Sequence, residues 1–368
     1  MTERCVTLFL AGDVMLGRGI DRILPHPGDP RLHERHAHSA ELYVRLAEAM
    51  HGPVPRHGGF AYVWGEALAA LRAAAPDLRI VNLETSVTAS DDAWPKGINY
   101  RMHPANVACL TEAGIDCCGL ANNHVLDWGE AGLLETLATL RRAGLRLAGA
   151  GRDAAEAAAP SVLPLSAGGR VLIYAFAADD SGVPPEWGAR ADRPGVALLP
   201  DLTAPTAARI AATAAAARRP GDLLVASVHW GGNWGWEVPP RHRGFAHALL
   251  DGGFDLLHGH SSHHAKGIEI YRGKLILYGC GDFINDYEGI SGYESFRPDL
   301  AVMYLARLHA DGTLAELALV PFQARRFRLG RVGAADAAWL HATLARESAG
   351  WGAAIRLRDD ATLVVEPG

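Results

Sequence analysis

Four histidines fall within seven residues of this chain, between His258 and His264, and they directly follow the apolar pair Leu256-Leu257. This pattern indicates a buried strand that opens into a loop, because Gly259 lets the backbone turn sharply. In α/β folds, binding and catalytic groups stand where strands open into loops. Neutral imidazole is the commonest metal ligand and a general acid or base near neutral pH. We therefore expect a site that contains histidine at the ends of strands.

Four other apolar runs end in a similar way. They lead into Asp13, into Glu84, into Asn122-Asn123-His124, and into His229. Together these groups offer carboxylate, amide and imidazole ligands without a thiolate, which is the ligand set of a borderline-hard transition metal. A single acid in such a position is more often a helix cap or a solvated loop charge. Five strand ends in sequence order instead predict one shared site.

The composition is that of an ordinary globular protein and narrows the choice of partners. The 368 residues are 49% hydrophobic and 21% charged, and the net charge is −6. This balance argues against nucleic acid as the main partner. The sequence has neither a charged segment followed by an apolar one at its start nor a run of eighteen apolar residues. We therefore expect a cytoplasmic protein with no membrane span.

The cysteines are odd in number, and their spacing fits neither a disulfide framework nor a zinc motif. They are Cys5, Cys109, Cys117, Cys118 and Cys280. We expect reduced thiols that are buried as small hydrophobic groups.

Helical and strand-like patterns alternate in the first part of the chain. Leucines at helical spacing predict a helix from about Glu130 to Gly144, and alanine-rich sequence predicts another over 207–218. In the last third, residues 267–279 and 300–322 each read as two strands about a turn with glycine. A mixed α/β sandwich with two sheets fits this order better than one purely parallel sheet.

No internal repeat and no linker rich in proline, serine or glycine divides the chain. We expect one catalytic domain over 1–330, with a C-terminal extension over 331–368 packed on it. Two long polar stretches, 21–59 and 282–299, are candidate lids, since loops of such length are usually functional or disordered. Their aromatic residues favour ordered loops.

Several side chains are candidates for substrate binding. Arg18, Lys96 and Arg101 could hold a carboxylate or phosphate, although a solvated surface charge is the simpler role for Lys96. Trp234 and Trp236 stand among glycines in a loop, where they are hard to bury, and they could line a substrate cleft. We expect solvent exposure for most of four histidines in the first long stretch, His26, His33, His36 and His38.

Several segments taken together resemble the CapA family of poly-gamma-glutamate capsule biosynthesis proteins. They are residues 12–18 (GDVMLGR), 82–84 (NLE), 122–124 (NNH) with 127–130 (DWGE), 229–231 (HWG), 259–263 (GHSSH) and 275–283 (LILYGCGDF). The resemblance covers most of residues 6–322. That family looks like a branch of the calcineurin-type metallophosphoesterases. The resemblance implies a four-layer α-β-β-α sandwich with mixed sheets and a metal site at the carboxyl ends of strands.

Carried over residue by residue, the resemblance implies the ligands of two metal positions. One position keeps Glu84, Asn123, His229 and His260. The other has Asp13, the shared Glu84, and His263 or His264. His124 matches the position that contacts the reacting group in the superfamily.

The chain departs from the superfamily pattern at two positions. Met15 stands where a histidine normally belongs to the second metal position, and Ser262 stands where the last histidine is normally found. A thioether cannot replace imidazole for a hard divalent ion. We therefore expect one divalent ion rather than two, with manganese, zinc and calcium all open as its identity.

Three functions are open at this point. The leading one is a metal-dependent hydrolase that acts on a phosphoester or an amide or γ-glutamyl bond in capsule or polymer biosynthesis. The second is a metal-dependent peptide epimerase in which Asp13 and His263 or His264 exchange protons on opposite sides of a carbon. The third is a non-catalytic accessory protein of polymer synthesis. The substrate would be a small molecule, a peptide or an anionic polymer.

Overall fold

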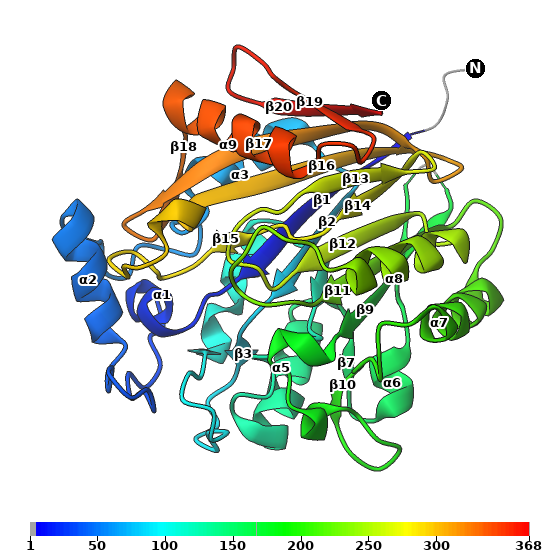
Figure 1. Ribbon diagram of the computed structural model, residues 1–368. Coiled ribbons are helices and arrows are strands. Elements are labelled where there is room, and N and C mark those ends of the chain that lie inside the picture. Colours follow the sequence, from blue (N-terminus) through cyan, green and yellow to red (C-terminus); the bar gives the residue numbers. More distant parts are fainter. Residues whose placement is uncertain (1–4, 167, 368) are drawn as a thin grey trace.

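Two β-sheets pack face to face between helices in the computed structural model, which describes residues 5–166 and 168–367 (Figure 1). Neighbouring strands are parallel at one side of the larger sheet and antiparallel at the other side. Its strands, in order across the sheet, are β19 (Ala353–Leu357), β20 (Leu363–Pro367), β17 (Leu314–Arg325), β16 (Leu300–His309), β1 (Cys5–Val14), β2 (Leu78–Leu83), β5 (Cys117–Gly119) and β6 (Arg146–Ala148). In addition, β15 (Asp282–Ile284) pairs with β1, and β18 (Arg328–Arg331) pairs with β17.

The second sheet is mixed as well. Its strands, in order, are β13 (Ile268–Tyr271), β14 (Lys274–Leu277), β12 (Leu256–His260), β11 (Leu223–His229), β9 (Arg170–Ala177) and β8 (Ser161–Pro164). The central pairs are parallel, and the pairs at both edges are antiparallel. The expected mixed α/β sandwich is therefore confirmed. Both predicted hairpins are also confirmed, as β13–β14 and β16–β17.

Helices cover the outer faces of both sheets and give the molecule its four layers (Figure 1). They are α1 (Arg18–Ile23), α2 (Glu41–His51), α3 (Gly65–Ala74), α4 (Ala108–Glu112), α5 (Gly129–Arg142), α6 (Ala154–Ala158), α7 (Ala204–Ala217), α8 (Pro240–Asp251) and α9 (Ala334–Glu347). The helices predicted near 130–144 and 207–218 correspond to α5 and α7. Two short ladders, β3 (Ser86–Val87) with β4 (Arg101–Met102) and β7 (Ala150–Gly151) with β10 (Gly195–Val196), lie outside the main sheets.

The second sheet is buried on both faces because successive residues of a strand point to opposite sides. In β11, Leu224 and Val228 pack in the same cluster as Phe245 and Leu249 of α8, while Val225 joins the core shared with the larger sheet. Such a strand reads as a continuous apolar run rather than an alternating one. This explains why the runs that end in polar residues are so uniformly apolar.

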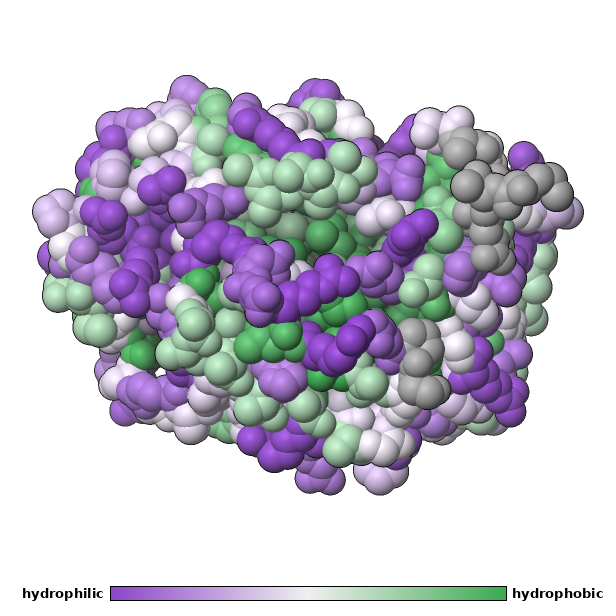
Figure 2. Space-filling model, turned by 90° about the horizontal axis from the view of Figure 1, so that it is seen from above, coloured by the Kyte–Doolittle hydropathy of each residue, from purple (hydrophilic) through white to green (hydrophobic). Residues whose placement is uncertain are grey.

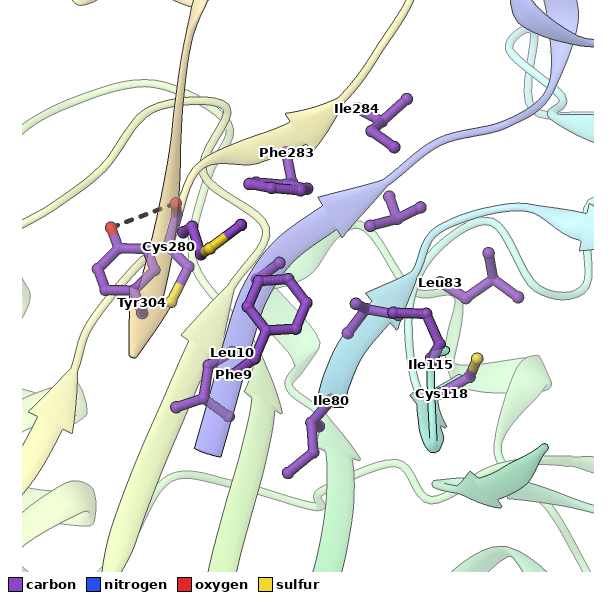
Figure 3. Packing of buried hydrophobic residues seen from close by; sticks show 14 of the residues in the cluster. Phe9, Leu10, Ile80, Leu83, Ile115, Cys118, Cys280, Phe283, Ile284 and Tyr304 are labelled. Carbon is purple, nitrogen blue, oxygen red and sulfur yellow. Dashed lines mark hydrogen bonds between the residues drawn. The ribbon is translucent and has the colours of Figure 1, made fainter. Parts of the chain in front are cut away.

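The core directly below the strand ends holds β15 in place. Figure 3 shows Phe283 beside Phe9 of β1, with ring centroids 5.8 Å apart. Tyr304 of β16 donates a hydrogen bond to the carbonyl oxygen of Cys280 at 3.3 Å. The amide of Cys280 donates to the carbonyl of Gly259 at 2.9 Å, so this segment is tied to both sheets.

The C-terminal extension lies against the rest of the chain and continues its larger sheet, since β20 pairs with β17. All five cysteines are in the described part of the chain and carry free thiols. Four are buried, as expected, whereas Cys5 is half-buried with its sulfur 3.6 Å from His309 Nδ1. His26, His33, His36 and His38 are all exposed, which agrees with the prediction. Among the described residues, no helix is both long and apolar enough to cross a membrane.

Close backbone approach at Gly12 generates a prediction about the fold. A Cβ atom added there would lie 1.9 Å from the carbonyl oxygen of Gly281, so β1 and β15 would have to separate. We expect Gly12→Ala to lower the free energy of unfolding by roughly 3 kcal/mol, measured by urea denaturation. The control is Gly244→Ala in α8, where the new methyl group meets nothing within 4 Å. This control should be neutral or stabilising by about 0.5–1 kcal/mol, and equal losses in both variants would contradict the account.

Candidate metal centre

The carboxyl ends of strands from both sheets meet at one place. Asp13 lies at the end of β1, Glu84 follows β2, Asn123 follows β5, and His229 and His260 are the last residues of β11 and β12. Their predicted placement at strand ends is thus confirmed. The two sheets are joined just below them, because the Nε2 atom of His258 lies 2.8 Å from the carbonyl oxygen of Ala11.

Three carboxylates lie together away from water. Asp13, Glu84 and Asp282 are 0%, 2% and 2% exposed. Asp13 and Asp282 are register partners on the parallel strands β1 and β15, and Asp13 Oδ1 accepts a hydrogen bond from Asn82 Nδ2 at 2.7 Å. Burial, together with the neighbouring Asp282 carboxylate, raises the pKa of Asp13 to about 6. Burial and the adjacent Asp13 carboxylate raise the pKa of Glu84 well above its ordinary value.

Two imidazoles stand beside these acids. The Nδ1 atoms of His229 and His260 lie 2.9 Å apart. On their other sides, His229 Nε2 is 3.2 Å from Asn123 Oδ1, and His260 Nε2 is 2.9 Å from Ser227 Oγ. Burial lowers the pKa of both histidines well below the usual range, so both rings are neutral. Neutral rings offer nitrogen lone pairs, as metal ligation requires.

This donor set fits a divalent cation. Asp13 Oδ2 is buried without a hydrogen-bond partner among the described residues. The ligand atoms of Asp13, His229 and His260 all lie within 4.8 Å of one another. The same holds for a second group, which consists of Asp13, His263 and Asp282. Carboxylates packed this closely repel each other unless protons or a cation neutralise them. Carboxylate oxygen and imidazole nitrogen together suit manganese or zinc.

Asp282 joins the site although its segment was expected only as the start of a lid. Its Oδ1 atom lies 2.9 Å from His263 Nδ1, and its Oδ2 atom accepts a hydrogen bond from Asn285 Nδ2 at 2.8 Å. The signal was present in the sequence. Residues 275–282 repeat the apolar run, glycine and acid that precede and include Asp13.

Met15 lies in the wall of the site rather than among the ligand atoms. It is 3% exposed, and its sulfur accepts a weak hydrogen bond from the Tyr287 hydroxyl at 3.5 Å. The Tyr287 ring in turn meets His263 edge to face at 5.1 Å. Within the part of the chain that the structure describes, Met15 belongs to neither ligand group.

His124 is oriented by a buried acid. Its Nδ1 atom lies 2.6 Å from Asp127 Oδ2, and its Nε2 atom lies 3.7 Å from Glu84 Oε1. The Tyr100 ring stacks on the imidazole at 3.9 Å. Burial lowers the pKa of His124 to about 4. The His124 ring is thus held so that its Nδ1 atom contacts Asp127 and its Nε2 atom faces Glu84.

Lys96 belongs to the same arrangement, so its interpretation as a solvated surface charge is corrected. Its ammonium group lies 2.7 Å from Asp127 Oδ1 and also donates to the carbonyl oxygen of Asn123. The side chain is only 18% exposed. No sequence pattern indicates this role, because Asp127 lies thirty-one positions away and no motif joins the two residues.

The structure separates the two adjacent histidines that the sequence left as alternatives. His263 lies with Asp13 and Asp282, and the Asp282 carboxylate raises the pKa of His263 against the opposing effect of burial. His264 points elsewhere, with its ring 4.3 Å from Trp236 and 4.8 Å from Phe296. Only His263 is therefore placed to serve the site.

The two predicted cleft tryptophans also differ in position. Trp234 is half-buried, stacks on Tyr293 at 4.0 Å, and lies 5.3 Å from the His263 ring. It borders the site. Trp236 packs with His264 and Phe296 instead.

Arg18 and Arg101 hold the surrounding loops. Arg18 is 4% exposed, and its guanidinium lies 2.5 Å from Asp286 Oδ1 and 3.0 Å from Glu34 Oε1. Arg101 donates to Asp91 Oδ1 at 2.9 Å, and its guanidinium carbon lies 3.8 Å above the Trp128 ring. A substrate anion would have to compete with these internal partners. The two arginines therefore support the rim of the site in this structure.

The raised pKa of Asp13 predicts a particular pH dependence. The pKa is about 6 in the folded protein against an ordinary 3.8, so the protonated side chain favours folding at low pH. That contribution is lost as the pH rises through 6. In the presence of a chelator, Asp13→Asn should therefore melt higher than the unmodified protein above pH 6, and the difference in melting temperature should vanish below pH 3.8. A difference that does not change with pH would contradict the buried acid cluster.

Comparison with known proteins agrees with this architecture. The family model "Bacterial capsule synthesis protein PGA_cap" matches residues 7–287. A probable polyglutamine synthesis accessory protein of Mycobacterium tuberculosis is 48% identical over 365 residues, which are 98% of this chain and 96% of that protein. The PGA biosynthesis protein CapA of Bacillus subtilis is 27% identical over 218 residues, 59% of this chain and 54% of that protein.

Among solved structures, the TT1561 protein of Thermus thermophilus aligns with a TM-score of 0.40 at 10% identity, covering 83% of this chain and all of that one. A likeness at this level carries no argument about activity. The family model and the mycobacterial relative are decisive, and they confirm the predicted CapA resemblance. The chain belongs to the bacterial capsule synthesis protein family PGA_cap.

Proposed function

We propose that the protein is a metal-dependent hydrolase that cleaves an amide or phosphoester bond during the synthesis of a capsule-type polymer. The observation that carries the proposal is the buried group of Asp13, Glu84 and Asp282 facing the neutral imidazoles of His229 and His260. Such a cluster is costly for a protein unless protons or a cation neutralise it, because like charges out of water repel strongly. Perturbed titratable groups of this kind gather at functional sites.

The residues of the chain have distinct roles in this proposal. Asp13, His229 and His260, whose ligand atoms lie together, would hold the cation. We propose Glu84 and Asn123, which follow β2 and β5, as its further ligands. A divalent cation bound there supplies Lewis-acid polarisation of a carbonyl or phosphoryl oxygen and activates water for attack.

His124 would accept a proton from the attacking water at its Nε2 atom and then pass it to the leaving group, since Asp127 holds the other ring nitrogen. Lys96 neutralises Asp127 and fixes the loop that carries Asn123. Trp234 would form part of the wall that keeps bulk water from the reacting group.

Family membership favours an amide bond in a polymer of glutamate-type units over a phosphoester. Relatives carry names that refer to polyglutamine synthesis and to PGA biosynthesis. A γ-glutamyl bond is the corresponding amide substrate. The phosphoester alternative rests on the resemblance to calcineurin-type enzymes.

The geometry favours hydrolysis over epimerisation. An epimerase needs its acid and base on opposite faces of one carbon, each about 3–3.5 Å from it, and hence about 6–7 Å apart. Asp13 and His263 instead offer atoms within 4.8 Å of each other, and His263 is already bonded to Asp282. These distances suit two ligands of one ion better than an acid and a base around a substrate.

Cation binding can be tested with matched variants. We expect one tightly held ion at Asp13, His229 and His260, and a weaker position at His263 and Asp282, where Met15 supplies no ligand. Titration of metal-free protein with manganese should lose the tight phase in His260→Ala and only the weak phase in Asp282→Asn. The control His264→Ala should keep both phases, because His264 lies among aromatic rings. Full binding in a His229→Ala, His260→Ala double variant would refute the assignment.

The reaction itself can be tested by incubating metal-loaded protein in D₂O with γ-glutamyl peptides, ordinary peptides and phosphoesters. We expect release of a new carboxylate and amine from a γ-glutamyl peptide, with no deuterium at any α-carbon. His124→Ala should lower the rate by roughly 10²–10⁴-fold without loss of bound metal. Deuterium at one α-carbon without cleavage would establish the epimerase instead. No turnover on any of these substrates would favour a non-catalytic accessory role.

A further inference from the structure

The hairpin of β17 and β18 carries four exposed arginines. They are Arg325, Arg326, Arg328 and Arg331. Arg325 and Arg328 are directly opposite each other across the strands, a placement that is unfavourable for like charges. Among the described residues, none forms an ion pair or hydrogen bond with the guanidinium of Arg325, Arg326 or Arg328. A cluster of unpaired positive charge is unusual on a protein whose net charge is −6.

The turn at the tip of this hairpin is strained and firmly held. Arg326 and Phe327 have φ values of +56° and +57°, where glycine or asparagine is usual. Phe327 is 2% exposed, and the Glu288 carboxylate accepts hydrogen bonds from the amides of Arg326 at 2.7 Å and Phe327 at 2.5 Å. The buried ring and the carboxylate compensate for the strain. Together they hold the turn so that the arginine side chains stay exposed. Backbone strain of the kind seen at Arg326 and Phe327 is often found at functional positions.

The arginines line a cavity that neighbours a second one at the wall of the candidate metal centre. All four border a cavity of about 440 Å³, together with Glu66 and Asp336. Gln323 is shared with a second cavity of about 340 Å³, which Asn285 and Tyr287 also line. These last two residues contact Asp282 and His263.

Hydrophilic residues gather on the left of the face seen in Figure 2, the side on which Figure 1 shows β18. Gln323 lines both cavities, and the second cavity also borders residues in the wall of the site.

We propose that this groove, formed by the arginines of the β17–β18 hairpin, binds a linear polycarboxylate. Guanidinium groups bind carboxylates through two parallel hydrogen bonds, and four of them along a hairpin match a chain that carries one carboxylate in each unit. Guanidinium groups pair with phosphate as well, so nucleic acid and anionic vesicles are the alternative ligands that the test compares. Such a polymer is also the substrate of the proposed function, and its cleavage after binding rests on that proposal. Binding in the groove, however, does not need the metal ion.

The test uses the full chain and fluorescent poly-L-glutamate, with binding followed by fluorescence anisotropy at low and high salt. The groove variant is Arg325→Glu with Arg328→Glu. The control, Arg209→Glu with Arg219→Glu, makes the same charge change at exposed arginines in and just after α7. We expect roughly tenfold or greater weakening in the groove variant and little change in the control. Melting curves should show both variants folded, because all four side chains are exposed.

Equal weakening in both variants, or no binding by the unmodified protein, would overturn the proposal. Tighter binding of DNA or of anionic vesicles than of poly-L-glutamate would also overturn it, in favour of a different partner. Binding should persist in His260→Ala and in the presence of a chelator. A failure of metal-dependent hydrolysis would therefore leave this result intact, and loss of polymer binding on chelation would place the polymer at the metal centre instead.

Discussion

The repulsion between three buried carboxylates is the constraint on which the rest of this structure depends. Asp13, Glu84 and Asp282 lie where water cannot screen them, and two of them have raised pKa values as a result. Two contacts bring these charges together. Gly12 lets β1 approach the backbone just before β15, and Asn82 donates a hydrogen bond to the Asp13 carboxylate. This concentration of negative charge beside neutral imidazole is the basis of our proposal that the site holds a cation.

The surrounding layers serve that arrangement in different ways. The contact of His258 with Ala11 joins the two sheets below the site, so ligands from both remain at fixed distances. Arg18, with Asp286 and Glu34, joins the first long loop to the segment that follows β15. That same segment carries Glu288, which holds the arginine hairpin. One continuous stretch of chain thus connects the acid cluster, the rim and the basic groove.

Much of this could be read from the sequence, because buried parallel strands leave a clear signal: an apolar run that stops at a polar residue. Asp13, Glu84, His229 and His260 were found in this way. Asp282 also follows an apolar run, that of β14, but it begins the short strand β15 instead of ending a strand, so the acid reads as the start of a loop.

Other positions depend on contacts that sequence spacing does not encode. Lys96 reaches Asp127 across a loop, and Arg18 is buried by residues from three separate segments. The choice between His263 and His264 depends on the contacts of each ring, with Asp282 for His263 and with Trp236 and Phe296 for His264. The central claim, that the acid cluster is a cation site, is tested most directly by anomalous X-ray diffraction from crystals grown with manganese. The account predicts a strong peak in contact with Asp13, His229 and His260. A map with manganese bound elsewhere, or with no peak at these residues at saturating manganese, would contradict it.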